Sequence, residues 1–216
     1  MISVILPALV LNDDLYSQAK KAINSVKTEN TEMIIVDNGS TVGKDFLEKS
    51  ADIYIRYPDK IGFGPACNAG VKISHGDHIL ITSIDVEYLT GKPEDLLEKL
   101  PIVCPSAIDK GQTLDNTLHR DETFGATFLI SREAYDLVKL PEGLYDERYE
   151  HGYYEDTDLW YRCDKLDIPL VRSGKVLVAH GQGTTNKYLG VLDKYMAENE
   201  KKFKEKWGVK EIKWRG

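Results

Sequence analysis

The chain has 216 residues, a length that suggests one domain with a sizeable core or at most two small ones. Hydrophobic residues make up 42% and charged residues 29%, a balance that excludes a disordered chain. The net charge of -7 argues against nucleic acid as a partner, because phosphate contacts need clustered lysine and arginine. The lysine-rich stretch 201–215 is interpreted as a solvated helix face, with weak peripheral membrane contact as the alternative.

The cysteine pattern argues against a disulfide framework or a zinc knuckle. Cys67, Cys104 and Cys163 are odd in number and widely spaced, which fits a reducing compartment such as the cytoplasm. A basic leader and a run of about 18 apolar residues are both missing from the sequence. We therefore expect a cytoplasmic protein with no cleaved signal and no membrane span.

Four short apolar runs in the first half predict strands. They cover residues 2–6, 32–36, 52–55 and 78–84. Their nearly continuous hydrophobicity suits strands that are buried on both faces of a parallel sheet. Apolar stripes over 15–26 and 65–74 predict helices between the strands, which gives the order βαβαβαβ. Right-handed crossovers then produce a doubly wound α/β sheet, with its ligand crevice where the strand order reverses.

Polar residues follow the predicted strands at their carboxyl ends. The second strand runs into Asp37, and the fourth runs into Asp85 and then Glu87. A single acid at such a place is commonly a turn former or a helix cap. Two acids at two strand ends favour a ligand site.

The second half alternates less regularly. Residues 101–106 predict a strand, and 109–123 predict a long loop without apolar periodicity. A strand over 124–131 leads into a helix over 132–138, and 168–181 predict one or two further strands. An amphipathic C-terminal helix follows from residue 186. No repeat or linker divides the chain, so we expect a single domain over 1–216.

Six short motifs resemble family-2 glycosyltransferases with the GT-A fold. In chain order they are VDNGS, IGFGPACNAG, SIDVE, FGATFLIS, YEDTDL and AHGQGTT, and FKEKWG is similar to the closing helix of the family. Rhamnosyltransferase-type members are the most similar. The resemblance implies a Rossmann-like domain with a mostly parallel central sheet, a donor half over about 1–100 and an acceptor and catalytic-base half over about 101–216. It also implies inverting, metal-assisted transfer of a sugar from a UDP- or dTDP-linked donor to a glycan or other hydroxyl acceptor.

The resemblance assigns a nucleotide site to the first half. The residues it implies are Pro7, Ala8, Asp37, Asn38, Gly39, Lys60, Gly62, Phe63, Asn68, Ser83 and Ile84. Asp37 or Asn38 would bind the base or ribose, and Asn68 would face the ribose or phosphates. Gly62 would let the backbone approach the phosphates at a helix N-terminus. The alternative is a plain glycine turn followed by a structural asparagine.

The metal site implied by the resemblance consists of Asp85 and His180, which would hold Mn²⁺ or Mg²⁺ and through it the diphosphate. Ser83 stands where the first acid of the family's DxD-type element is expected, so metal binding would be weak or dispensable. His180 could instead be structural. His151 in the acidic loop is the competing histidine.

The resemblance makes Asp156 the general base, with Glu155 orienting the acceptor or sharing the proton. A helical stripe places Asp156 on the buried face with Leu159, and it leaves Asp158 outside, paired with Arg162. The alternative for Asp156 is a simple N-cap.

The acceptor is expected beside four tyrosines, because aromatic faces suit sugar rings. They are Tyr145, Tyr149, Tyr153 and Tyr154, and packing between helix and sheet is the alternative for each. Two other functions stay open. One is a noncatalytic nucleotide-sugar binding protein, and the other is a sugar nucleotidyltransferase, for which the stretch PALVLNDD lacks a glycine-rich basic loop.

Overall fold

The computed structural model describes residues 1–97, 101–108, 118–120, 125–149, 152–181, 189–190 and 192–212. The elements in chain order are β1 (Ile2–Ala8), α1 (Asp13–Val26), β2 (Thr31–Asn38), α2 (Lys44–Ser50), β3 (Ile53–Tyr57), α3 (Phe63–Lys72), β4 (His78–Ile81), β5 (Val86–Thr90), the 3-10 helix η1 (Pro93–Leu96), β6 (Ile102–Ala107), β7 (Leu118–Arg120), β8 (Phe128–Ser131), α4 (Arg132–Val138), α5 (Glu155–Lys165), β9 (Leu170–His180) and α7 (Leu192–Trp207).

One central sheet organises the fold, with the strand order β3-β2-β1-β4-β8-β6-β9-β5 and β7 paired to β9. The pairs among β1, β2, β3 and β4 are all parallel. β6 and β9 are also parallel, whereas β8, β5 and β7 pair antiparallel with their neighbours. β2 lies on one side of β1 and β4 on the other, so the strand order reverses between β1 and β4. The predicted βαβαβαβ unit and the α/β fold class are confirmed.

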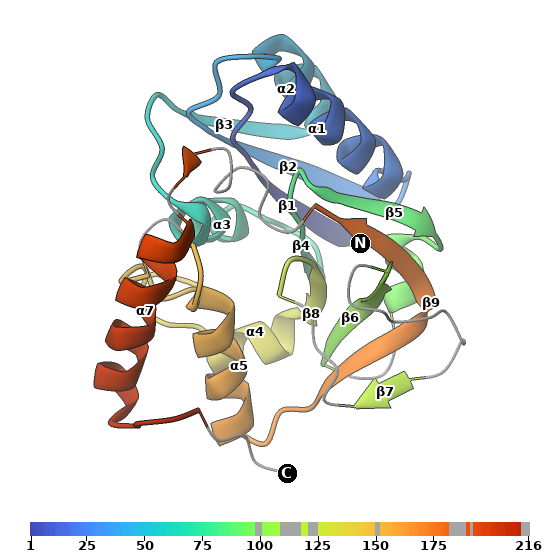
Figure 1. Ribbon diagram of the computed structural model, residues 1–216. Helices are drawn as coiled ribbons and strands as arrows, with labels where there is room; N and C mark the ends of the chain where they lie inside the picture. The colour runs from blue at the N-terminus through green and yellow to red at the C-terminus, as the bar shows by residue number, and fades with distance from the viewer. Residues whose placement is uncertain are drawn as a thin grey trace.

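Helices cover both faces of the sheet (Figure 1). α1 and α2 lie together over β1–β3, and the rings of Tyr16 and Phe46 join them with centroids 5.7 Å apart. α3, α4 and α5 gather on the opposite side, where α7 runs beside α5.

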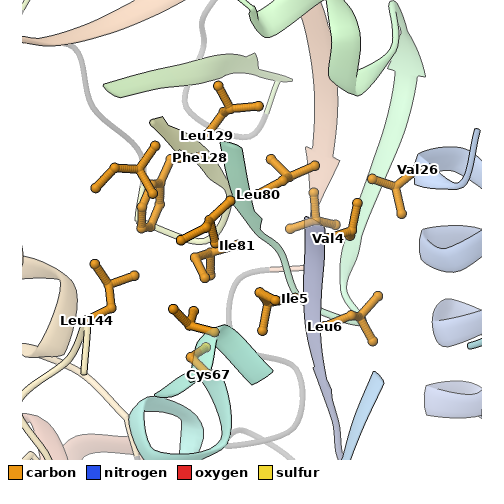
Figure 2. Close-up of a cluster of buried hydrophobic side chains, with 14 of the residues drawn as sticks. Val4, Ile5, Leu6, Val26, Cys67, Leu80, Ile81, Phe128, Leu129 and Leu144 are labelled. Atoms are coloured by element: carbon orange, nitrogen blue, oxygen red, sulfur yellow. The ribbon is translucent and has the colours of Figure 1, made fainter. Parts of the chain in front are cut away.

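The core follows from the two-residue period of β1, which sends successive side chains to opposite faces. Leu6 faces α1, where Val26 lies, while Ile5 faces α3 and Cys67 (Figure 2). All four side chains are essentially buried. A Cβ on Gly70 of α3 would lie 2.6 Å from the Ile5 side chain, so glycine is what lets α3 approach β1 this closely.

Four expected elements differ in extent. The strand expected over 124–131 is shorter, because β8 covers only Phe128–Ser131 and residues 125–127 form a turn. The run 78–84 is not one strand, because β4 ends at Ile81 and the chain turns through 82–85 into β5, which pairs with β9 at the end of the strand order. β7 lies inside the stretch interpreted as a loop, and the remaining residues of 109–123 lie outside the described part. The stretch 168–181 forms the single strand β9. No helix in the described part of the chain is long and apolar enough to cross a membrane.

Candidate active site

The carboxyl ends of β1 and β2 lie side by side, with Ala8 in register with Asp37. Asp37 is fully buried, and its carboxylate accepts hydrogen bonds from the Ser40 N–H at 2.8 Å, the Tyr54 hydroxyl at 2.7 Å and the Arg56 guanidinium. Burial together with the bond to Asp37 raises the pKa of Tyr54 to about 12. Both oxygens of Asp37 are therefore engaged, by side chains of β3 and by the turn that follows β2.

Asn38 fastens the loop that follows β3 to the end of β2. Its Nδ2 donates to the Gly62 carbonyl at 3.0 Å, and its Oδ1 accepts from the Ile61 N–H at 2.7 Å. Gly39, at a φ of 94°, lies against the backbone of Lys60. Burial lowers the pKa of the Lys60 side chain. The structure thus brings together the expected residues at the ends of β1 and β2 and the loop that enters α3.

Asn68 has a different environment from the one expected. Its Nδ2 donates to the Tyr145 carbonyl at 2.8 Å and to the Glu147 carboxylate at 3.0 Å, and its Oδ1 accepts from the Tyr145 N–H at 2.9 Å. Phe63 packs nearby, with its ring centroid 5.9 Å from that of Tyr145. Asn68 therefore holds the loop over 143–147 against α3, and its contact with a nucleotide stays a prediction.

Asp85 and His180 meet where β5 begins and β9 ends. Their Oδ2 and Nε2 atoms are 3.6 Å apart, and the Gly181 N–H donates to the Asp85 carbonyl at 2.8 Å. Ser83 donates from its hydroxyl to the other carboxylate oxygen of Asp85, and the intervening Ile84 is buried. The pair lies at a pocket of about 240 Å³, and the lining residues are Gln18, Lys21, Ile84, Asp85, Val86, Glu87, Ala179, His180 and Gly181.

The Asp85–His180 pair suits a divalent cation that completes its shell elsewhere. Mg²⁺ is commonly held by one or two carboxylates plus substrate phosphates and water. No group of three or more histidine, cysteine, aspartate or glutamate side chains with metal-site geometry occurs within the described residues. Any cation here would therefore depend on oxygens of a bound phosphate or of water. This agrees with Ser83 at the position where the DxD-type element has its first acid.

Glu155 opens α5 as a buried carboxyl group, only 7% exposed. Its Oε2 has no hydrogen-bond partner among the described atoms. Burial, assisted by the nearby charge of Asp156, raises the pKa of Glu155 to about 8. Glu155 is therefore mostly protonated at neutral pH.

Asp156 is partly exposed and lies in the first turn of α5. Its Oδ1 accepts from the Thr157 N–H at 2.6 Å. A Cβ built on Gly125 would lie 2.0 Å from its Oδ2, so only glycine at 125 leaves room for the carboxylate. The N-cap of α5 is Tyr154, which argues against the N-cap alternative for Asp156. Sequence reasoning missed Gly125, although FGATFLIS displayed a glycine just before a strand.

The expected faces of α5 were wrong. Asp158 is fully buried and Asp156 is not, the reverse of the prediction. The predicted pair between Asp158 and Arg162 does form, at 3.1 Å, and Lys206 adds a second cation at 2.7 Å from Asp158. A carboxylate can be buried when cations and donors surround it, and here one cation comes from a distant helix.

The acidic loop before α5 divides its tyrosines between two environments. Tyr145 and Tyr149 are buried, and the Tyr149 hydroxyl donates to Asp158 at 3.1 Å, so packing is their role. Tyr153 and Tyr154 are partly exposed beside Asp156. His151 lies outside the described residues.

Polar strand ends that meet where the strand order reverses are the hallmark of nucleotide-binding, doubly wound α/β proteins. The family model described as Glycosyl transferase family 2 matches residues 3–146, and the chain belongs to this family. The matched range ends before α5, so Asp156 lies outside it. A search of the curated proteins finds no match.

Solved structures share the fold. GalNAc-T7 with UDP, GalNAc and Mn²⁺ aligns with a TM-score of 0.67 at 14% identity, over 83% of this chain and 43% of that one. The mannosyltransferase PcManGT from Pyrobaculum calidifontis, in complex with GDP-Man and Mn²⁺, aligns with 0.62 at 13%, over 83% and 56%. S. aureus TarS 1–349 aligns with 0.59 at 13%, over 82% and 59%. The chain therefore spans about half the length of these structures.

Proposed function

We propose that the chain is an inverting glycosyltransferase that moves a sugar from a UDP- or dTDP-linked donor to an acceptor hydroxyl. The observation that carries the proposal is the Asp85–His180 pair, 3.6 Å apart beside a pocket, in a member of glycosyl transferase family 2. Asp156 is the proposed general base. A cytoplasmic location is part of the proposal, because Cys67, Cys104 and Cys163 are buried and not joined by disulfides.

Asp85 and His180 are the residues that would hold Mn²⁺ or Mg²⁺. Two of the similar structures, GalNAc-T7 and PcManGT, contain Mn²⁺ together with nucleotide ligands. When bound, such a cation supplies positive charge that stabilises the departing nucleoside diphosphate. Ser83 orients the Asp85 carboxylate by its hydrogen bond but adds no charge of its own, so we expect weak binding of metal in the absence of nucleotide.

Asp156 has the exposure and the fixed geometry that a general base needs. It would take the proton of the acceptor hydroxyl while the acceptor oxygen attacks the anomeric carbon in line, and no covalent enzyme intermediate forms. Neighbouring Glu155 is mostly neutral at pH 7, so it adds little negative charge beside Asp156.

A nucleotide-sugar binding protein without turnover is the second candidate. Ser83 favours it, because the DxD-type element then has fewer charged ligands than catalysis commonly uses. Nucleotide binding together with no release of nucleoside diphosphate from any donor would select this candidate.

The decisive experiment is calorimetric titration with UDP, dTDP and GDP, each with and without Mn²⁺. Asp85→Ala should abolish the metal-dependent part of the binding. Glu48→Ala, which removes an exposed acid on α2, is the charge-matched control and should bind like the wild type. Absence of binding by all three nucleotides would refute the donor site.

The lysines of α7 have partners that suit a solvated helix. Lys204 pairs with Glu200 at 2.6 Å and Lys201 with Glu205 at 3.8 Å. Weak peripheral membrane contact through the basic C-terminus stays a prediction, and vesicle co-sedimentation with anionic lipid would test it.

A further inference from the structure

The backbone just before α5 adopts an unusual conformation. Gly152, Tyr153 and Tyr154 have φ angles of 101°, 71° and 70°, in three consecutive positions. Residues other than glycine rarely adopt positive φ angles. Two bulky residues in succession with positive φ need surrounding contacts that hold their backbone in this conformation. The next residues along the chain are Glu155 and Asp156, so this turn sets the direction in which α5 starts.

Asn199 of α7 holds this turn through its side chain. Its Nδ2 donates to the Gly152 carbonyl at 2.9 Å and to the Tyr153 carbonyl at 3.1 Å. Asn199 is only 1% exposed, so a polar side chain is buried within the apolar stripe of an amphipathic helix. An asparagine amide has two N–H donors on one nitrogen, which suits two successive carbonyls.

The same face of α7 also contacts residues on both sides of Asp156. Phe203, one turn after Asn199, packs against Tyr154 with ring centroids 5.8 Å apart. One further turn along, Lys206 and Trp207 donate to Asp158, with Nζ and Nε1 at 2.7 Å and 2.8 Å from its Oδ1. α7 lies alongside α5 over this length (Figure 1). The segments before and after Asp156 are thus held by one helix.

We propose that Asn199 is a positioning residue for glycosyl transfer and acts on Asp156 through the 152–154 turn. The inference rests on the proposed function of Asp156. Without the Asn199 amide, two carbonyls lose their donor and the turn can relax towards negative φ. The start of α5 then rotates, and the Asp156 carboxylate leaves its place against Gly125. A displacement of about 1 Å in a reacting group can reduce the rate by about 10²-fold.

A double-mutant cycle tests this coupling. The assay measures release of nucleoside diphosphate from UDP- and dTDP-hexoses, with benzyl glycosides as acceptors. Asn199→Ala should lower kcat by about 10- to 100-fold and change the Kd for the donor nucleotide less than about twofold. In an Asp156→Asn background, the same substitution should lower kcat by less than about twofold, because the group that it positions is already lost.

The control for a general loss of stability is Leu47→Ala, which removes buried packing under α2, on the opposite side of the sheet from α5. Its Tm should fall at least as far as that of Asn199→Ala, while its kcat stays within about threefold of the wild type. Equal losses of kcat in the two variants would overturn the inference. Equal losses from Asn199→Ala in both Asp156 backgrounds would also overturn it.

Hydrogen exchange measured by mass spectrometry gives a readout that does not depend on activity. Amides in a peptide covering 152–158 should exchange at least about tenfold faster in Asn199→Ala than in Leu47→Ala. Unchanged exchange would overturn the inference and leave the proposed function intact. A wild-type chain that releases no nucleoside diphosphate, or a fully active Asp156→Asn variant, would refute the proposed function and this inference with it.

Discussion

The buried carboxyl group of Glu155 makes a prediction about stability that needs no substrate. Glu155 is 7% exposed, and burial raises its pKa from 4.5 to about 8, with Asp156 as a further cause. Folding therefore binds a proton at this residue between those two values. Below pH 4.5 both the folded and the unfolded chain are protonated, and no cost arises. As the pH rises towards 8, the unfolded chain gains a favourable ionisation that the folded chain lacks, so stability is lost.

The expected size of this loss follows from the linkage relation. Each pH unit in the interval costs about 1.4 kcal/mol, so the free energy of unfolding should fall by about 3 kcal/mol between pH 5 and pH 7.5 through Glu155 alone. Glu155→Gln removes the titration and keeps the shape of the side chain. The difference between wild type and variant isolates this group from every other titrating residue. Its dependence on pH is the predicted quantity, because a buried amide adds a cost that does not change with pH.

The assay is urea unfolding, followed by tryptophan fluorescence at pH 5, 6, 7 and 8. The free energy of unfolding of Glu155→Gln, relative to the wild type, should rise steadily with pH across this range. Glu94→Gln is the matched control. Burial of Glu94 is outweighed by hydrogen bonds, first from Thr28, so its pKa is lowered and its contribution is constant above about pH 5. The difference in free energy of unfolding between Glu155→Gln and the wild type could prove as independent of pH as the difference for Glu94→Gln. That result would refute the reasoning.

Four further predictions concern the site and its support. Asp156→Asn should lower kcat by about 10² to 10⁴ with nearly unchanged donor Kd, as steady-state kinetics and calorimetry can check; loss of donor binding as well would make the residue structural or metal-binding. Gly125→Ala should lower kcat by about tenfold or more at constant donor Kd, because the added Cβ would lie 2.0 Å from the Asp156 carboxylate; full activity would contradict the close contact. Ser83→Asp places a second acid near Asp85 and should tighten Mn²⁺ binding in the presence of UDP by about tenfold, measured by calorimetry; an unchanged Mn²⁺ affinity would argue against a cation at this place. Asp158→Asn should reduce the free energy of unfolding by about 3 kcal/mol, because it leaves the buried Arg162 without its carboxylate; a change of Tm below 2 °C would contradict that role.

The sequence predicted the parallel part of the fold well because its signal is local. Continuous apolar runs such as ISVIL and EMIIV occur where strands are covered on both faces, and β1 and β2 are buried almost throughout. The stretch HILITSI was misinterpreted as one strand for the same reason. Its hydrophobicity continues past Ile81, although the backbone turns there to reach β9 across the sheet. Pairing with a strand almost 100 residues later leaves no mark in a local window.

The prediction for α5 failed through a comparable limit. A helical stripe sorts apolar residues from polar ones, so it placed Asp158 towards solvent. Arg162, the partner expected from the sequence, lies on the same helix as Asp158. Lys206, the second cation that compensates the buried charge of Asp158, lies on α7. Charge compensation between separate elements therefore overrides the stripe, and only the tertiary structure reveals it.

The polar motif residues divide by how their hydrogen-bonding groups are used. The side chains of Asp37 and Asn68 form hydrogen bonds with neighbouring segments of the chain, which fixes the walls of the site. Asp85 lines the pocket, and Asp156 is partly exposed beside a glycine, so we expect both to meet a ligand. A sequence motif cannot separate these two uses, because an aspartate that braces a loop and one that binds a ligand carry the same letter. The division explains why substitutions at Asp37 or Asn68 should first lower stability, whereas substitutions at Asp85 or Asp156 should first lower binding or turnover.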